Sequence, residues 1–101
     1  MTTTSHHHDL RASVAAASRT LAGHGLLIGT AGNVSARAGD VVAVTATGVV
    51  LGEATADDVT VVDLGGAVVE GTLAPTSELA LHLGVLRSAP AEKVSAVVHT
   101  H

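Results

Sequence analysis

Residues 34–47, VSARAGDVVAVTAT, contain two β-compatible runs that are joined by a short loop with Gly39 and Asp40. Runs rich in Val and Thr, separated by a Gly-containing loop, are typical of a β-hairpin. Residues 59–71, VTVVDLGGAVVEG, repeat this arrangement, with Gly65-Gly66 at the predicted tight turn. The middle of the chain is therefore predicted to form two hairpins of an antiparallel sheet.

Helices are predicted before and after these hairpins. In residues 10–24, LRASVAAASRTLAGH, apolar residues recur at spacings of three and four, with Asp9 as a plausible N-cap and Gly25 as the stop. Residues 75–88, PTSELALHLGVLRS, carry a leucine stripe after a proline, and the hydroxyl residues that follow the proline can cap a helix. Residues 93–101, KVSAVVHTH, are predicted to be the last strand.

The order of these elements predicts the fold class. A helix, two hairpins, a second helix and a strand indicate an α/β fold with a central, largely antiparallel sheet flanked by helices. A short helical turn is predicted at residues 55–58, TADD, between the hairpins. Residues 1–9 are polar and are predicted to be a disordered tail, so that residues 10–101 form the folded domain.

The composition excludes several classes of protein. A chain of 101 residues with 47% hydrophobic and 14% charged residues can bury the core of one domain, built here without any aromatic residue. A net charge of −4 without a basic cluster argues against nucleic acid and anionic membranes as partners. The absence of cysteine excludes disulfides and thiolate metal ligands. No apolar stretch approaches the ~20 residues that a membrane helix needs.

Two histidines in the last strand, His99 and His101, suggest a metal site. Residues i and i+2 of a strand share a face, so both imidazoles project to the same side. Imidazole nitrogen is a preferred zinc ligand. Read alone, the H-x-H pair is better explained as exposed histidines at the end of a strand, because so short a motif is common.

Glu78 stands near the start of the second predicted helix, where a carboxylate is favoured electrostatically whatever its function. A carboxylate beside a metal could instead ligate it or transfer a proton. His82 lies on the same helix face, but the surrounding leucines favour a packed, internally hydrogen-bonded histidine. His24 is predicted to interact with the end of the first helix.

Three stretches of small polar residues and glycine could together bind an anion. They are GTAGN at 29–33, TATG at 45–48 and PTSE at 75–78. Phosphate can be bound without Lys or Arg by backbone N–H groups, hydroxyls and a helix N-terminus, which would suit an acidic protein. Glycine and small polar residues are common in turns, so each stretch alone is weak evidence of function. Only the order of the three stretches along the chain favours an anion-binding site.

These motifs, in this order, resemble the N-terminal half of the class II aldolase/adducin family, from about Leu10 to His101. The resemblance implies that His99 and His101 are zinc ligands, and that Glu78 contacts the metal in the resting enzyme and serves as acid and base. A third zinc histidine would lie beyond residue 101. The resemblance also implies a site for a substrate phosphate, made of Thr30, Asn33, Thr47, Gly48, Thr76 and Ser77.

The activity implied by this resemblance is zinc-dependent aldol cleavage of a ketose 1-phosphate, of the L-fuculose phosphate type, to dihydroxyacetone phosphate and an aldehyde. The chain is expected to be the N-terminal part of such a domain, truncated after the H-T-H strand and inactive or incomplete alone. One Zn²⁺ per subunit, a homotetramer and a cytoplasmic location are expected for the full-length protein. A pentulose-phosphate 4-epimerase, a sugar-phosphate dehydratase and a non-catalytic fragment or binding module are the alternatives.

Overall fold

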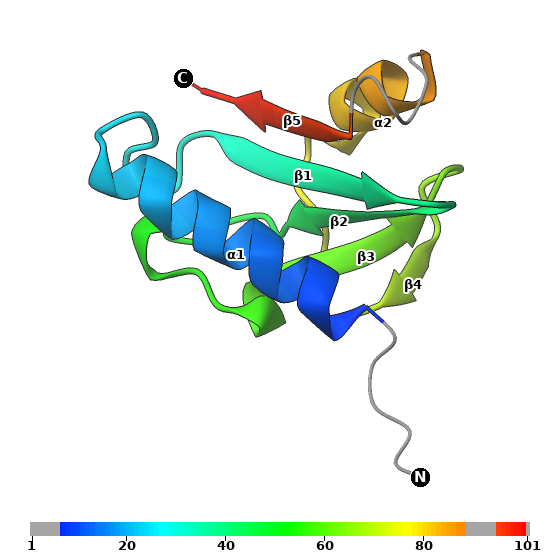
Figure 1. Ribbon diagram of the computed structural model, residues 1–101, viewed down its shortest axis with the longest axis horizontal. Helices are drawn as coiled ribbons and strands as arrows, with labels where there is room; N and C mark the ends of the chain where they lie inside the picture. The colour runs from blue at the N-terminus through cyan, green and yellow to red at the C-terminus, as the bar shows by residue number, and fades with distance from the viewer. Residues whose placement is uncertain (1–6, 89–94, 101) are drawn as a thin grey trace, which may run out of the picture.

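A computed structural model describes residues 7–88 and 95–100 of the chain. Its helices and strands follow one another in the order expected from the sequence (Figure 1). They are α1 (His8–Gly23), β1 (Asn33–Ala38), β2 (Val41–Thr45), η1 (Leu51–Glu53), η2 (Ala56–Asp58), β3 (Val59–Asp63), β4 (Val68–Glu70), α2 (Leu79–Ser88) and β5 (Ala96–His99), of which η1 and η2 are single 3₁₀ turns.

The strands form one five-stranded sheet in the order β4-β3-β2-β1-β5. All four neighbouring pairs are antiparallel. Both predicted hairpins are confirmed, with β1 joined to β2 and β3 joined to β4, and η2 confirms the predicted helical turn. The last strand, β5, pairs with β1, so the end of the described chain forms one edge of the sheet.

The core explains why the two central strands, β2 and β3, are rich in valine. On one face of the sheet, Ala43 and Val61 pack against α1, and on the other Val42 and Val62 pack against α2. A strand that is covered on both faces must be apolar at every position, rather than at alternate ones. Figure 1 shows α1 lying across one face of the sheet, which confirms the prediction of a central sheet flanked by helices.

The predicted helix starts are wrong in detail. Helix α1 begins at His8, so that Asp9 lies in its first turn instead of capping it, where the carboxylate still faces the positive end of the helix dipole. Helix α2 begins at Leu79, after Glu78. The reason is that the preceding segment is held as an extended chain beside β2, where the Thr76 N–H donates to the carbonyl of Thr45 at 3.0 Å.

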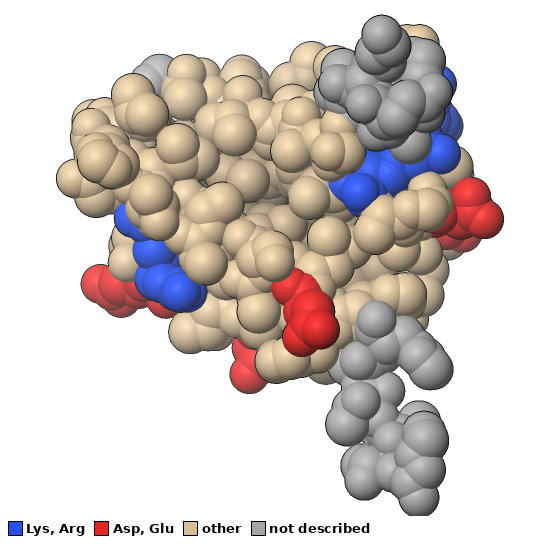
Figure 2. Space-filling model, in the orientation of Figure 1, with Lys and Arg blue, Asp and Glu red and all other residues tan. Residues whose placement is uncertain are grey.

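Figure 2 shows the charged side chains on one face of the molecule. The blue Lys and Arg groups on this face are small and separate, and red acidic side chains lie close to some of them. No broad basic surface covers this face of the described residues. None of the helices within residues 7–88 is long and apolar enough to span a bilayer.

Candidate functional site

A cavity of about 250 Å³ opens where the ends of several segments meet beside β1 and β2. Its lining residues come from the three stretches of small polar residues and glycine that were predicted to bind an anion. Its lining consists of Thr30, Ala31, Gly32, Asn33, Ala46, Thr47, Gly48, Thr76, Ser77 and Glu78. The six residues predicted for a phosphate site are therefore neighbours of one another and of Glu78.

Gly32 brings the first stretch into place. Its φ of +91° lies in a region that L side chains rarely adopt, and a Cβ atom added there would lie 2.7 Å from Leu27 Cδ2 and 2.8 Å from the carbonyl oxygen of His99. Only glycine therefore allows the loop before β1 to run so close to β5. The same approach places Asn33 opposite His99 in the register of the two strands.

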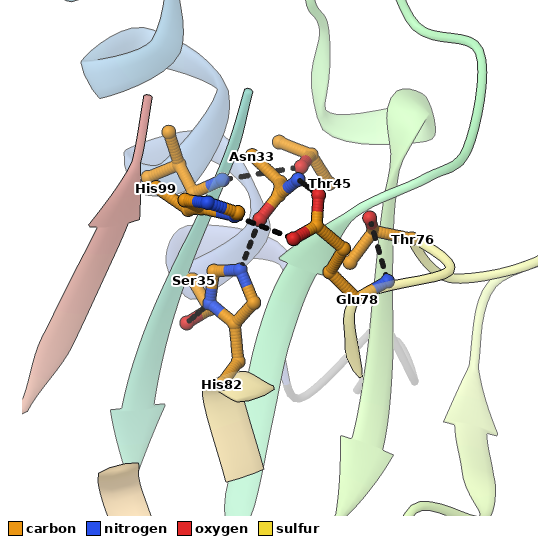
Figure 3. A network of polar contacts seen from close by, with 8 residues as sticks. Asn33, Ser35, Thr45, Thr76, Glu78, His82 and His99 are labelled. Carbon is orange, nitrogen blue, oxygen red and sulfur yellow. Dashed lines mark hydrogen bonds and ion pairs between the residues drawn. The ribbon is translucent and has the colours of Figure 1, made fainter. Parts of the chain in front are cut away.

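The third stretch is fixed by backbone pairing to the end of β2. Thr47 N donates to the carbonyl of Ala74 at 3.0 Å, and Pro75 and Ala46 form an isolated antiparallel bridge. Thr76 is buried, and its Oγ1 accepts a hydrogen bond from the N–H of Glu78 at 3.3 Å. These contacts place Glu78 immediately before α2, with its side chain directed toward β1 and β5 (Figure 3).

Glu78 contacts two residues that lie far from it in the chain (Figure 3). Asn33 Nδ2 donates to Glu78 Oε1 at 3.3 Å, and His99 Nδ1 lies 2.7 Å from Glu78 Oε2. The side chains of His99 and Glu78 are 30% and 31% exposed, so both are partly open to solvent, although His99 Nδ1 itself is buried. The structure thus joins the carboxylate to the first histidine of the H-T-H motif.

His82 lies beneath this pair and is completely buried. Its Nδ1 lies 2.6 Å from Ser35 Oγ, and its Nε2 is hydrogen-bonded to Asn33 Oδ1. Burial lowers the pKa of His82 below its usual value of 6.5; the nearby His99 lowers it further, and Glu78 acts in the opposite direction. His82 is therefore the packed and internally bonded histidine that the sequence predicted, and both of its nitrogens are engaged.

The donors at the site are of a kind that suits zinc, which binds imidazole nitrogen and carboxylate oxygen. Glu78 and His99 converge, whereas His101 lies outside the described residues. Within residues 7–88 and 95–100, no group of three or more His, Cys, Asp or Glu residues is placed to hold a metal ion. His24 is the C-cap residue of α1 through its backbone N–H and is exposed, and the predicted interaction of its imidazole with the helix end stays a prediction.

The predicted phosphate residues differ in what their side chains can do. Thr30, Thr47 and Ser77 are exposed at the cavity, whereas Asn33 and Thr76 are buried. Sequence reasoning missed the contact of Ser35 with the site. A signal was present, because positions 33 and 35 of a strand share a face.

Comparison with known proteins identifies the family of the chain. The model of the family described as Class II Aldolase and Adducin N-terminal domain matches residues 12–101. An L-fuculose phosphate aldolase of Methanococcus vannielii is 44% identical over 75 residues, which are 74% of this chain and 39% of that protein.

Solved structures share the fold. One L-fuculose 1-phosphate aldolase matches with a TM-score of 0.83 and 29% identity, over 92% of this chain and 44% of that one. The l-fuculose-1-phosphate aldolase of Thermus thermophilus matches with a TM-score of 0.73 and 32% identity, over 91% of this chain and 44% of that one. The chain thus spans less than half the length of these relatives, and the family match covers most of the chain. It belongs to the class II aldolase and adducin family.

Proposed function

We propose that this chain is the N-terminal part, residues 10–101, of a zinc-dependent aldolase that cleaves a ketose 1-phosphate of the L-fuculose type to dihydroxyacetone phosphate and an aldehyde. One observation carries the proposal. A cavity lined by hydroxyl groups and glycine lies directly beside the paired side chains of Glu78 and His99. Such a site offers an anion pocket on one side and a carboxylate with an imidazole on the other.

The cavity supplies hydrogen-bond donors for a phosphate group. The exposed hydroxyls of Thr30, Thr47 and Ser77 can donate to phosphate oxygens. Ser77 lies just before α2, and the N-terminus of a helix attracts anions through its free N–H groups. Phosphate binding here would hold the substrate in register with Glu78, and binding energy far from the reacting bond can assist catalysis in this way.

His99, Glu78 and His101 would hold the metal in this proposal. When bound, zinc would act as a Lewis acid that stabilises negative charge on the substrate oxygens. Glu78 would move a proton to and from the carbon next to the carbonyl group, at one of its two carboxylate oxygens. The Asn33 N–H that donates to Oε1 orients the carboxylate of Glu78 for this role.

Association of subunits belongs to the same proposal, which includes a homotetramer. Ile28 is 74% exposed, Val98 on β5 is 47% exposed, and Leu81 on α2 is 47% exposed. Apolar side chains exposed to this degree are consistent with surfaces that other subunits cover. Sedimentation velocity of the protein would measure the number of subunits.

The reaction is tested by product analysis after metal removal. The full-length protein, of which this chain is proposed to be the N-terminal part, is treated with a chelator, supplied with zinc, and given L-fuculose 1-phosphate or a pentulose 5-phosphate. We expect zinc-dependent release of dihydroxyacetone phosphate from the first substrate. A changed C4 configuration of the pentulose phosphate without cleavage would show that the protein is an epimerase and not an aldolase. Loss of water from the substrate would show that it is a dehydratase. Zinc binding without any conversion would favour a non-catalytic role.

A further inference from the structure

Four polar side chains form one continuous hydrogen-bonded chain from the core to the site. Ser35 contacts His82, His82 contacts Asn33, and Asn33 contacts Glu78 (Figure 3). Ser35 and His82 are completely buried, and Asn33 is 4% exposed. Only Glu78 at the end of this chain reaches the cavity opening to a substantial degree. Ser35 and His82 do not line the cavity, so they act on the site through Asn33 and Glu78.

The direction of each hydrogen bond follows from the chemistry of the groups. An ionised Glu78 can only accept, so Asn33 must present its Nδ2 amide nitrogen to Oε1. The Oδ1 of Asn33 then faces His82 Nε2, which must carry a hydrogen. In a neutral imidazole the other nitrogen, Nδ1, is left as an acceptor, and the hydroxyl of Ser35 donates to it. Burial of His82 makes this neutral form the favoured one.

We propose that His82 is a positioning residue of the site: it holds the Asn33 amide in the one orientation that donates to Glu78, and Ser35 holds His82 in the tautomer that this requires. Without the N–H of His82, the Asn33 amide can rotate and present its oxygen to the carboxylate. Two acceptors would then face each other, and Glu78 would lose its fixed position. The catalytic consequence rests on the proposed role of Glu78, whereas the hydrogen-bonded arrangement does not.

The first experiment follows the Asn33 side chain without any assay of activity. Hydrogen exchange of the Asn33 side-chain amide is measured by NMR in the wild type, His82→Leu and His82→Gln. A glutamine can place an amide N–H near the position of the imidazole Nε2–H, so it is the conservative variant. We expect exchange at least about tenfold faster in His82→Leu and close to the wild-type rate in His82→Gln. Equal exchange in all three proteins would overturn the proposal.

A second experiment measures cleavage by the full-length protein. We expect kcat to fall about 10- to 100-fold in His82→Leu, as is usual for residues that orient a metal-site ligand, and to recover in His82→Gln. Leu86→Val is the matched control, because Leu86 is buried on the same helix in the adjoining core and has no part in the hydrogen-bonded chain. Rates are expressed per folded molecule. A rise in KM alone, or the same loss in His82→Gln as in His82→Leu, would contradict the positioning role.

The two experiments separate this inference from the proposed function. If the wild-type protein binds zinc but cleaves no ketose 1-phosphate, the proposed function is contradicted. The exchange rates of the Asn33 side-chain amide would still test the role of His82. Should His82→Leu fail to fold, Ser35→Ala removes the hydroxyl that fixes the tautomer and keeps the imidazole. Faster Asn33 exchange in Ser35→Ala would support the inference, and unchanged exchange would contradict it.

Discussion

Asn33 and Glu78 lie 45 positions apart in the chain, yet Asn33 Nδ2 donates a hydrogen bond to Glu78 Oε1 at 3.3 Å. This contact joins the start of β1 to the residue that precedes α2. It also connects the hydroxyl-lined cavity with His99, which pairs with Asn33 across the two strands. The proposed metal and phosphate sites are therefore parts of one site, and changes to the backbone around Asn33 should affect both.

Gly32→Ala should destabilise the protein and disturb His99. The added Cβ would meet Leu27 Cδ2 and the His99 carbonyl at 2.7 and 2.8 Å, on a backbone with a φ of +91°. Together, the strain and the clash are expected to lower the free energy of unfolding by about 2 kcal/mol or more. Chemical denaturation measures this change.

Gly39→Ala is the matched control for that variant. Gly39 also has a positive φ, of +60°, but nothing lies within 4 Å of the position of its Cβ. It therefore reports the backbone strain without the clash. Equal losses of stability in the two variants would show that the loop does not approach β5 as closely as described.

Thr47→Val should weaken binding of a phosphate-bearing substrate. Valine keeps the size of the side chain but removes the hydroxyl that the cavity exposes. Loss of a hydrogen bond to a charged group costs about 1.5–3 kcal/mol, which corresponds to a rise in KM of about tenfold or more, with a smaller change in kcat. Thr72→Val, an exposed threonine that is absent from the cavity lining, should leave KM unchanged. Similar KM values for the two variants would show that the substrate phosphate does not bind at the Thr47 hydroxyl.

His82 should make stability depend on pH near neutrality. Its pKa in the folded protein lies below the value of 6.5 that it has when exposed, chiefly because of burial. Between these two pKa values the unfolded chain binds more protons, so stability rises with pH. The contribution is fully present above pH 6.5 and is lost as the pH falls toward the lower pKa, with a slope of up to about 1.4 kcal/mol per pH unit.

The measurement compares the free energies of unfolding of wild type and His82→Gln at pH 7.5 and pH 5.5. The wild type should lose more stability between these values than the variant, because glutamine does not titrate. The exposed histidines are the same in both proteins and cancel in the comparison. An equal loss in both proteins would mean that His82 titrates in the fold as it does in the unfolded chain.

Local sequence signals predicted most of the elements. The hairpin between β1 and β2 follows from two apolar runs around Gly39, and that between β3 and β4 from two runs around Gly65-Gly66. Turn residues act over a few positions, so they can be recognised in a single sequence. The order of three separated polar stretches, together with the family resemblance, led to the expectation that they would meet, and the cavity brings them together.

Contacts between distant residues could not be predicted in the same way. The pairing of β5 with β1 is set by register across more than half of the chain. Glu78 precedes α2 because Thr76 is held by backbone pairing to Thr45, which no helix signal reveals. Strand spacing places Ser35 on the same face as Asn33, but the bond between Ser35 and His82 depends on how α2 packs on the sheet, so spacing does not identify His82 as its partner.

The most direct test of the account uses the full-length protein and its Glu78→Gln variant, and measures the rate of zinc-dependent release of dihydroxyacetone phosphate from L-fuculose 1-phosphate. Glutamine nearly preserves the shape of the side chain but cannot accept the proton, so kcat should fall about 10²- to 10⁴-fold. Glu53→Gln, at an exposed carboxylate in η1, should cleave at the wild-type rate. Cleavage by Glu78→Gln at the wild-type rate, or cleavage that does not depend on zinc, would contradict the account.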